Sequence, residues 1–234
     1  MMKKNLAIIL AGGTGSRMAG DLPKQFLTLA GKTILQYSLE KFENHPHIHH
    51  IFLVSHGNFL NQVKKIVHKS GYQKVIKILT AGPTRQESSR IGVTAAAPGE
   101  YENVLVHDAA RPLVSKKIID EILAALDTYA AVNIAVPSPD TIIEINDKNL
   151  VKNVPDRKYL RRVQTPQGFK WDLIQKAHLL ALEKGITDAP DDCSLILAFK
   201  LADIYVVEGS PLNIKITYPQ DLHLAKNYLK IENP

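Results

Sequence analysis

The chain has 234 residues, of which 45% are hydrophobic and 22% are charged. This composition is typical of a globular α/β domain and excludes an intrinsically disordered chain. The formal net charge of +6 favours anionic partners, whereas an aromatic content of 6% argues against a channel that stacks nucleic-acid bases.

The single cysteine and the start of the chain bear on its compartment. Cys193 has no second cysteine with which to form an internal disulfide, so we expect a reducing environment. The apolar residues before Gly12 are too few for a secretory signal or a membrane span. We therefore expect a cytoplasmic protein that binds small phosphorylated ligands and has no nucleic-acid or membrane partner.

Short apolar runs alternate with segments of helical spacing along most of the chain. The first run ends in Ala-Gly-Gly, as in a buried parallel strand that leads into a phosphate-facing loop. This alternation predicts an α/β fold, a single Rossmann-like, doubly wound, mostly parallel sheet in one domain over 1–234. The predicted strands are 5–10, 51–55, 75–79, 104–107, 132–136 and 204–207, and the predicted helices are 34–42, 60–69, 88–97, 116–130 and 171–184.

Two short extended runs interrupt that alternation. Residues 140–145 and 150–154 flank the turn-forming sequence Asn-Asp-Lys-Asn, which predicts a protruding β-hairpin arm at about 137–162. A two-stranded element is marginal alone, so the arm either packs on a second copy of the chain, giving a homodimer, or folds back on its own domain.

The segment after the first strand is rich in glycine and is followed by two basic residues. Glycines let backbone N–H groups approach phosphate oxygens, and a serine hydroxyl adds a donor. Arg17 and Lys24 place positive charge where the α-phosphorus of a triphosphate becomes more negative in the transition state. The predicted triphosphate site comprises Ala11, Gly12, Gly13, Gly15, Ser16, Arg17 and Lys24.

Two other glycine motifs do not fit this segment. A P-loop requires Lys-Ser or Lys-Thr after its last glycine, but Asp21 follows Gly20. A dinucleotide-binding fingerprint requires a third glycine where Met18 stands, which disfavours a dehydrogenase. A tight structural turn would explain the glycines but not Arg17 and Lys24, so the segment favours nucleotidyl transfer.

Two later segments carry candidate ligand-binding side chains. Asp108 and Arg111 follow a predicted strand, where ligands gather in open α/β sheets. Asp108 can accept from sugar hydroxyls or hold a divalent ion, and Arg111 can reach a phosphate or form a structural pair with Asp108. Lys215 lies in an Ile-Lys-Ile-Thr run that we interpret as a strand, and in isolation it reads as a surface lysine.

A third segment, with Gly82, Arg85 and Ser88, follows the third predicted strand. A glycine turn there leads into a helix that Ser88 is predicted to cap. Asp191 and Asp192 are interpreted as an acidic cluster at another helix N-terminus rather than as metal ligands.

Taken together, these motifs resemble the cytidylyltransferases that make CDP-linked alditols. The likeness is strongest to the 2-C-methyl-D-erythritol 4-phosphate family, and the ribitol-5-phosphate enzymes are close relatives. It runs in order through the glycine segment and through 108–112, 164–167 and 213–217, over nearly the whole chain.

The resemblance implies a role for each matching residue. Arg17 and Lys24 would stabilise the transition state, while Arg157 and Lys215 would place the attacking phosphate. Mg²⁺ would accompany CTP, with Asp108 as a candidate ligand. The implied nucleotide contacts add Gly82, Arg85, Ser88, Asp108 and Ala109, and the implied alditol phosphate contacts are Asp108, Arg111, Thr141, Arg157, Thr165 and Lys215.

The chain departs from the family pattern at two prolines. Pro83 stands where a side chain able to hydrogen-bond is common, and Pro139 stands where the erythritol enzymes carry a basic residue before Asp140-Thr141. Segments 156–161 and 191–195 nevertheless resemble the erythritol branch more than the ribitol branch. A ribitol or other alditol phosphate enzyme, and a non-catalytic nucleotide-binding protein, remain as alternatives.

Overall fold

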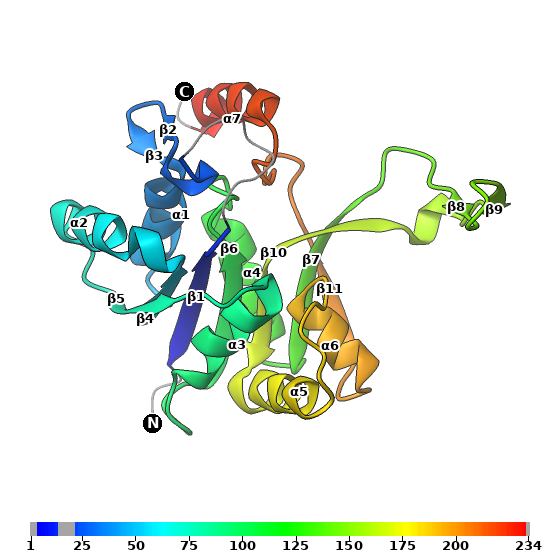
Figure 1. The fold of residues 1–234 in the computed structure, drawn as a ribbon, viewed down its shortest axis with the longest axis horizontal. Helices are drawn as coiled ribbons and strands as arrows, with labels where there is room; N and C mark the ends of the chain where they lie inside the picture. Colours follow the sequence, from blue (N-terminus) through cyan, green and yellow to red (C-terminus); the bar gives the residue numbers. More distant parts are fainter. Residues whose placement is uncertain (1–3, 14–21, 233–234) are drawn as a thin grey trace.

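A seven-stranded sheet forms the centre of the computed structural model, which describes residues 4–13 and 22–232 (Figure 1). Its strands are β1 (Asn5–Ala11), β4 (His50–Ser55), β5 (Val75–Thr80), β6 (Asn103–Asp108), β7 (Ala131–Pro137), β10 (Arg161–Lys170) and β11 (Ile204–Glu208). Their order is β11-β7-β10-β6-β1-β4-β5, and β10 runs antiparallel to both of its neighbours. The other pairings are parallel, which confirms the predicted mostly parallel, doubly wound sheet.

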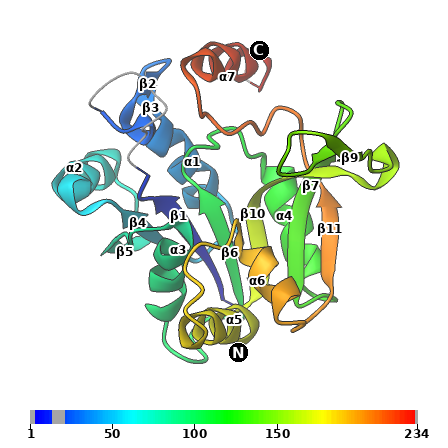
Figure 2. The same cartoon turned by 45° about the vertical axis from the view of Figure 1, so that its right-hand side comes forward.

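Helices cover both faces of this sheet (Figure 2). One face packs against α1 (Ile34–Glu43), α2 (Leu60–Ser70) and α4 (Lys116–Ala125), and the other packs against α3 (Arg85–Thr94), α5 (Trp171–Glu183) and α6 (Asp192–Ala198). The remaining elements are the helix α7 (Pro219–Glu232), the 3-10 turns η1 (Lys24–Phe26), η2 (Gly57–Phe59) and η3 (Arg157–Tyr159), and the short pairs β2 (Thr28–Leu29) with β3 (Lys32–Thr33) and β8 (Glu144–Ile145) with β9 (Val151–Asn153).

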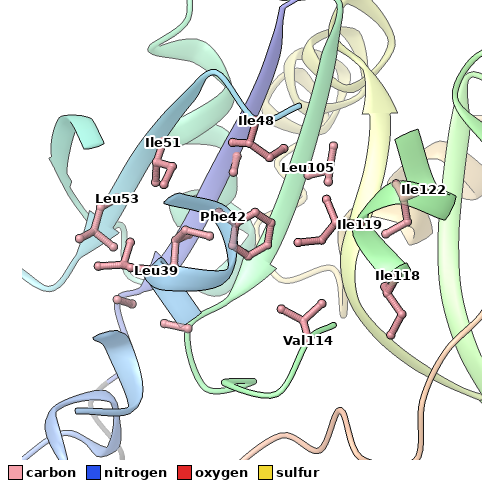
Figure 3. Close-up of a cluster of buried hydrophobic side chains, with 14 of the residues drawn as sticks. Leu39, Phe42, Ile48, Ile51, Leu53, Leu105, Val114, Ile118, Ile119 and Ile122 are labelled. Atoms are coloured by element: carbon pink, nitrogen blue, oxygen red, sulfur yellow. The ribbon is translucent and has the colours of Figure 1, made fainter. Parts of the chain in front are cut away.

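The alternation of side chains along each strand divides the core into two layers. In β1, Ala7 and Ile9 face the layer with α1 and α4, whereas Leu6 and Ile8 face the layer with α3 and α5. Figure 3 shows the first layer, with Phe42 surrounded by aliphatic side chains from the strands and from α4. Each fully buried side chain of this size stabilises the fold by roughly 1.5–3 kcal/mol.

The contact between α3 and β1 depends on Gly92. A Cβ added at Gly92 would lie 2.5 Å from Cγ2 of Ile8, so the helix can approach the strand this closely because the residue is glycine. Gly92→Ala is expected to lower the free energy of unfolding by about 1–2 kcal/mol, because overpacking outweighs the gain in helix propensity. Urea unfolding would measure this loss. The control is Thr94→Ala at an exposed position of the same helix, expected to stay within about 0.5 kcal/mol, and an equally stable Gly92→Ala variant would contradict the packing.

Several element predictions were wrong or incomplete. The pattern did not predict β10 or α7, and the helix predicted over 116–130 ends at Ala125, with Leu126 as its C-cap. The helix predicted over 88–97 begins at Arg85, because the Thr84 side chain accepts a hydrogen bond from the Glu87 N–H and caps it.

The predicted hairpin is present and extends away from the sheet (Figure 1). The chain leaves the sheet after β7, forms β8 and β9, and returns as β10. Many large apolar side chains of this arm are exposed, among them Ile143 (50%), Leu150 (60%) and Val151 (60%). In the part of the chain that the structure describes, no helix is long and apolar enough to span a membrane.

Candidate active site

A cavity of about 320 Å³ lies at the carboxyl ends of β1 and β6. Within the sheet, β4 follows β1 in the chain and lies next to it on one flank, while β6 lies next to β1 on the opposite flank. The strand order therefore reverses between β1 and β6, and such a switch point is where α/β sheets bind ligands. Among the described lining residues, three side chains are cationic and one is a carboxylate, which suits an anionic ligand. The lining residues are Leu10, Ala11, Gly12, Gly13, Lys24, Gln25, Gly82, Pro83, Thr84, Arg85, Ser88, Asp108, Ala109, Ala110, Lys215 and Thr217.

The glycine turn after β1 borders the cavity, with Gly12 and Gly13 among the lining residues. A Cβ on Gly12 would lie 2.5 Å from the Ala81 Cβ, so the backbone of the turn can pass here because no side chain is present. The predicted contacts of Gly15, Ser16 and Arg17 lie outside the described residues.

Gln25 is a structural residue of the site that the sequence reasoning missed. Its buried Nε2 donates to the carbonyl oxygens of Ala11 at 2.8 Å and Gly13 at 2.9 Å. One side chain therefore ties the backbone on either side of Gly12 to η1, where Lys24 lines the cavity. The available signal was the position of Gln25 directly after Pro23-Lys24.

The loop after β5 forms another wall, with Gly82, Pro83, Arg85 and Ser88 among its lining residues. Ser88 does not cap α3, contrary to the prediction. Its hydroxyl lies inside the first turn and donates to the Thr84 carbonyl at 2.9 Å, because Thr84 already occupies the cap position.

Asp108, at the end of β6, lies between two cations. Lys215 Nζ donates to its Oδ2 at 2.6 Å, and Arg85 Nε donates to its Oδ1 at 3.0 Å. Burial alone would raise the pKa of Asp108, but Arg85 and Lys215 outweigh burial and hold that pKa well below its usual range. Asp108 is therefore a carboxylate at neutral pH.

Arg85 bridges Asp108 to a second carboxylate, that of Asp192. Its Nη1 donates to Asp192 Oδ2 at 2.8 Å. Burial alone would lower the pKa of Arg85, but the two carboxylates raise it, so the guanidinium stays charged. Asp191 caps α6 by accepting from the Ser194 N–H, which confirms the helix N-terminus predicted there.

Arg111 and Thr165 support the site from behind the cavity wall. Arg111 donates to the backbone carbonyls of Asn213 (2.8 Å) and Val163 (3.3 Å) and not to the Asp108 carboxylate. The Thr165 hydroxyl accepts from the Asp108 N–H at 3.0 Å and lies 3.2 Å from His107 Nδ1. Neither Arg111 nor Thr165 is among the residues lining the cavity.

His107 is neutral and completes this support. Burial lowers its pKa to about 4, so at neutral pH it carries one ring proton. We place that proton on Nε2, which lies 3.1 Å from the Arg111 carbonyl, so that Nδ1 accepts from the Thr165 hydroxyl. Because its side chain is buried, His107 orders the turn after β6 and does not face the cavity.

Lys215 reaches the cavity from a loop and not from a strand, contrary to the prediction. The segment between β11 and α7 is irregular, and the Ile216 N–H donates to the Ala110 carbonyl at 2.8 Å. Ile216 is buried in a small cluster with residues of α7, while Lys215 points to Asp108. The apolar neighbours therefore do lie opposite the lysine, as the alternation suggested.

Thr141 and Arg157 are not brought into this cavity. Both are exposed residues of the arm, and Arg157 donates to the Pro139 carbonyl at 3.3 Å. The structure thus brings Ala11, Gly12, Gly13, Lys24, Gly82, Arg85, Ser88, Asp108, Ala109 and Lys215 together around one cavity.

The described residues do not form a metal site of their own. Among residues 4–13 and 22–232, no group of three or more His, Cys, Asp or Glu side chains could hold a metal ion. Magnesium, however, is commonly held by one or two carboxylates together with substrate phosphates. A single ionised carboxylate such as Asp108, in a cavity with cationic walls, fits that arrangement.

Sequence comparisons match nearly the whole chain. The chain is 39% identical over 233 residues to a 2-C-methyl-D-erythritol 4-phosphate cytidylyltransferase of Thermobifida fusca, covering 96% of this chain and 92% of that protein. It is also 40% identical over 226 residues to a bifunctional ribulose 5-phosphate reductase/CDP-ribitol pyrophosphorylase of Haemophilus influenzae. That match covers 95% of this chain but 47% of the relative.

Solved structures give the same picture. A 4-diphosphocytidyl-2C-methyl-D-erythritol synthase of Anaerococcus prevotii superposes with a TM-score of 0.87 at 30% identity, covering 97% of this chain and 99% of that one. The 2-C-methyl-D-erythritol 4-phosphate cytidylyltransferase of Thermus thermophilus gives 0.76 at 31% identity, covering 98% and 100%. A sequence model of the 2-C-methyl-D-erythritol 4-phosphate cytidylyltransferase family matches residues 5–231, and the chain belongs to this family.

Proposed function

We propose that this protein transfers cytidine monophosphate from CTP to 2-C-methyl-D-erythritol 4-phosphate and releases pyrophosphate. The observation that carries the proposal is the convergence of Lys24, Lys215 and Asp108 on a glycine-walled cavity at the switch point of the sheet. Lys24 and Lys215 come from opposite ends of the chain, so the fold brings two cations to the place where two anionic substrates would have to meet.

The reaction needs positioning and charge stabilisation more than proton transfer. An oxygen of the alditol phosphate attacks the α-phosphorus of CTP, and the bond from that phosphorus to the bridging oxygen breaks, leaving its electron pair on pyrophosphate. The nucleophile is already anionic near neutral pH, so no general base is required. Lys24 and Arg17 would stabilise the transition state, and Lys215 would orient the attacking phosphate.

Magnesium would be held by Asp108 together with the triphosphate oxygens. When bound, it would neutralise charge on the phosphates. The proposed setting is the cytoplasm, where both phosphorylated substrates would be available.

We further propose that the arm joins two chains into a homodimer, with each 1–234 chain acting as one nucleotidyltransferase domain. The exposed apolar side chains of the arm favour burial against another surface. Thr141 and Arg157 lie on this arm and outside the cavity of their own chain. Contact with the alditol phosphate would then be made in the cavity of the partner chain.

Ribitol 5-phosphate is the second candidate acceptor, favoured by the similarity to the Haemophilus influenzae CDP-ribitol pyrophosphorylase. Pyrophosphate release, measured across four nucleoside triphosphates and both alditol phosphates, separates the candidates. We expect kcat/KM to be highest for CTP with the erythritol substrate. A preference for ribitol 5-phosphate would show that this alditol phosphate is the acceptor substrate. Turnover with UTP or GTP alone would contradict cytidylyl transfer.

A further inference from the structure

Asp192 lies outside the cavity but contacts it through a single side chain, that of Arg85. The Asp192 carboxylate is 1% exposed and does not line the cavity. Arg85 does line the cavity, and its guanidinium contacts both Asp192 (Nη1 to Oδ2, 2.8 Å) and Asp108 (Nε to Oδ1, 3.0 Å). An unbroken row of charges therefore runs from the interior to the edge of the cavity.

Asp192 is itself held from several elements. Its Oδ1 accepts from the Ser89 hydroxyl on α3 and from His178 Nε2 on α5, the latter at 3.1 Å. Its backbone N–H donates to Gln167 Oε1 on β10 at 3.1 Å. Both Ser89 and His178 are fully buried, so their hydrogen bonds hold the Asp192 carboxylate in one position. Arg85 donates to this immobile carboxylate.

We propose that Asp192 is a positioning residue for cytidylyl transfer: it fixes Arg85, and through Arg85 it fixes the orientation of the Asp108 carboxylate. The inference rests on the proposed function. The hydrogen bond from Arg85 to Oδ1 of Asp108 orients the carboxylate so that its Oδ2 faces Lys215. Each carboxylate oxygen still has a lone pair that can bind a substrate hydroxyl or a metal ion.

Asp192 also determines the charge that Arg85 presents to the ligand. With both carboxylates in place, Arg85 is balanced by two negative groups. Without the negative charge of Asp192, the Arg85 guanidinium stays charged but is held only by its bond to Asp108. It can then turn toward the triphosphate. Binding of CTP is then retained or strengthened, while Asp108 loses its fixed partner and the chemical step slows.

Asp192→Asn tests this inference, because asparagine has the same shape but no charge. We expect kcat to fall about tenfold, the size seen when a residue supporting a ligand group is removed, with the KM for CTP unchanged or lower. Calorimetric binding of CTP should be at least as tight as in the unmodified protein. A variant whose loss appears as a raised KM for CTP at unchanged kcat would contradict the positioning role.

Asp191→Asn is the matched control, since it removes a charge from the neighbouring residue of the same helix N-terminus. Asparagine is as good an N-cap as aspartate, and the Asp191 side chain accepts hydrogen bonds from Ser194 and Gln167, not from Arg85. We expect kcat to stay within twofold of the unmodified protein. A loss as large as that of Asp192→Asn would show a general effect of α6.

A double-mutant cycle with Arg85→Met tests whether Asp192 acts through Arg85. In the Arg85→Met background, adding Asp192→Asn should leave kcat unchanged and raise the unfolding temperature, because it removes a buried carboxylate that has lost its cation. A further tenfold loss of kcat in that background would contradict the inference. Pyrophosphate release by the unmodified protein is measured alongside, and its absence would contradict the proposed function instead.

Discussion

Lys24→Ala is expected to lower kcat by about 10²–10³-fold, the cost of removing one fixed stabilising group from a transition state. Lys24 begins η1 and lines the cavity beside the glycine turn. In the proposed reaction this is where charge on the α-phosphorus would increase. The interaction strengthens in the transition state, so kcat should fall much more than the affinity for CTP. Pyrophosphate release at saturating substrates would measure kcat, and calorimetry would measure CTP affinity.

Lys32→Ala is the control for this prediction. Lys32 is an exposed lysine of β3 that pairs with Glu40 at 2.7 Å, and it does not line the cavity. Its replacement should leave kcat unchanged, because Lys32 lies outside the cavity. The fold should also be unaffected, because exposed ion pairs contribute little to stability. Near-normal turnover of a folded Lys24→Ala variant would exclude Lys24 from the reaction.

Arg157→Ala is expected to lower kcat/KM for the alditol phosphate by about 100-fold, because a misplaced nucleophile reacts slowly. If the arm crosses to a partner, a heterodimer of Arg157→Ala and Lys24→Ala chains contains one cavity with both residues intact. Such a heterodimer, isolated with two different affinity tags, should recover roughly half of the unmodified activity per dimer.

The geometry of the isolated chain motivates this experiment. Arg157 is exposed on the arm and does not line the cavity of its own chain. The two parent homodimers provide the baseline, since each lacks one residue in both cavities. A heterodimer no more active than its parents would show that each arm serves its own chain.

The sequence predicted most of the sheet, since the strands β1, β4, β5, β6, β7 and β11 all correspond to predicted apolar runs. The buried strand 5–10 and the glycines after it are local features, so β1 and the turn could be predicted from apolar periodicity and backbone freedom. Asp108 could be placed at the cavity because it ends a buried strand, at the edge where parallel sheets gather ligands, and Lys24 because it follows the glycine segment.

The antiparallel strand β10 was missed because three of its six buried residues, Gln164, Thr165 and Gln167, are polar. Gln164 donates to the Ser210 carbonyl at 2.8 Å, and Gln167 donates to Asn133 at 3.2 Å and Asp191 at 2.8 Å. Each partner lies more than twenty residues away, so the sequence around β10 shows no apolar pattern. Burial made favourable by distant hydrogen-bond partners cannot be predicted from local periodicity.

The pairing of Arg85 with Asp192 was missed for a related reason. The two residues are 107 positions apart, and each has a sound local explanation, one in a ligand loop and one at a helix N-terminus. Only the packing of α3, α5 and α6 on one face of the sheet places them at 2.8 Å.

The root of the arm has a consequence for how this protein can diverge. Pro137 at the end of β7 pairs with Arg161 at the start of β10, so the chain leaves and re-enters the sheet at one point. Residues 138–160 therefore form an insertion between neighbouring strands, and changing the length of such an insertion costs little free energy. The arm can be lengthened, shortened or recombined while the body of the fold keeps its packing. If the arm joins two chains as proposed, related chains in one cell can evolve separate pairing preferences through this segment alone.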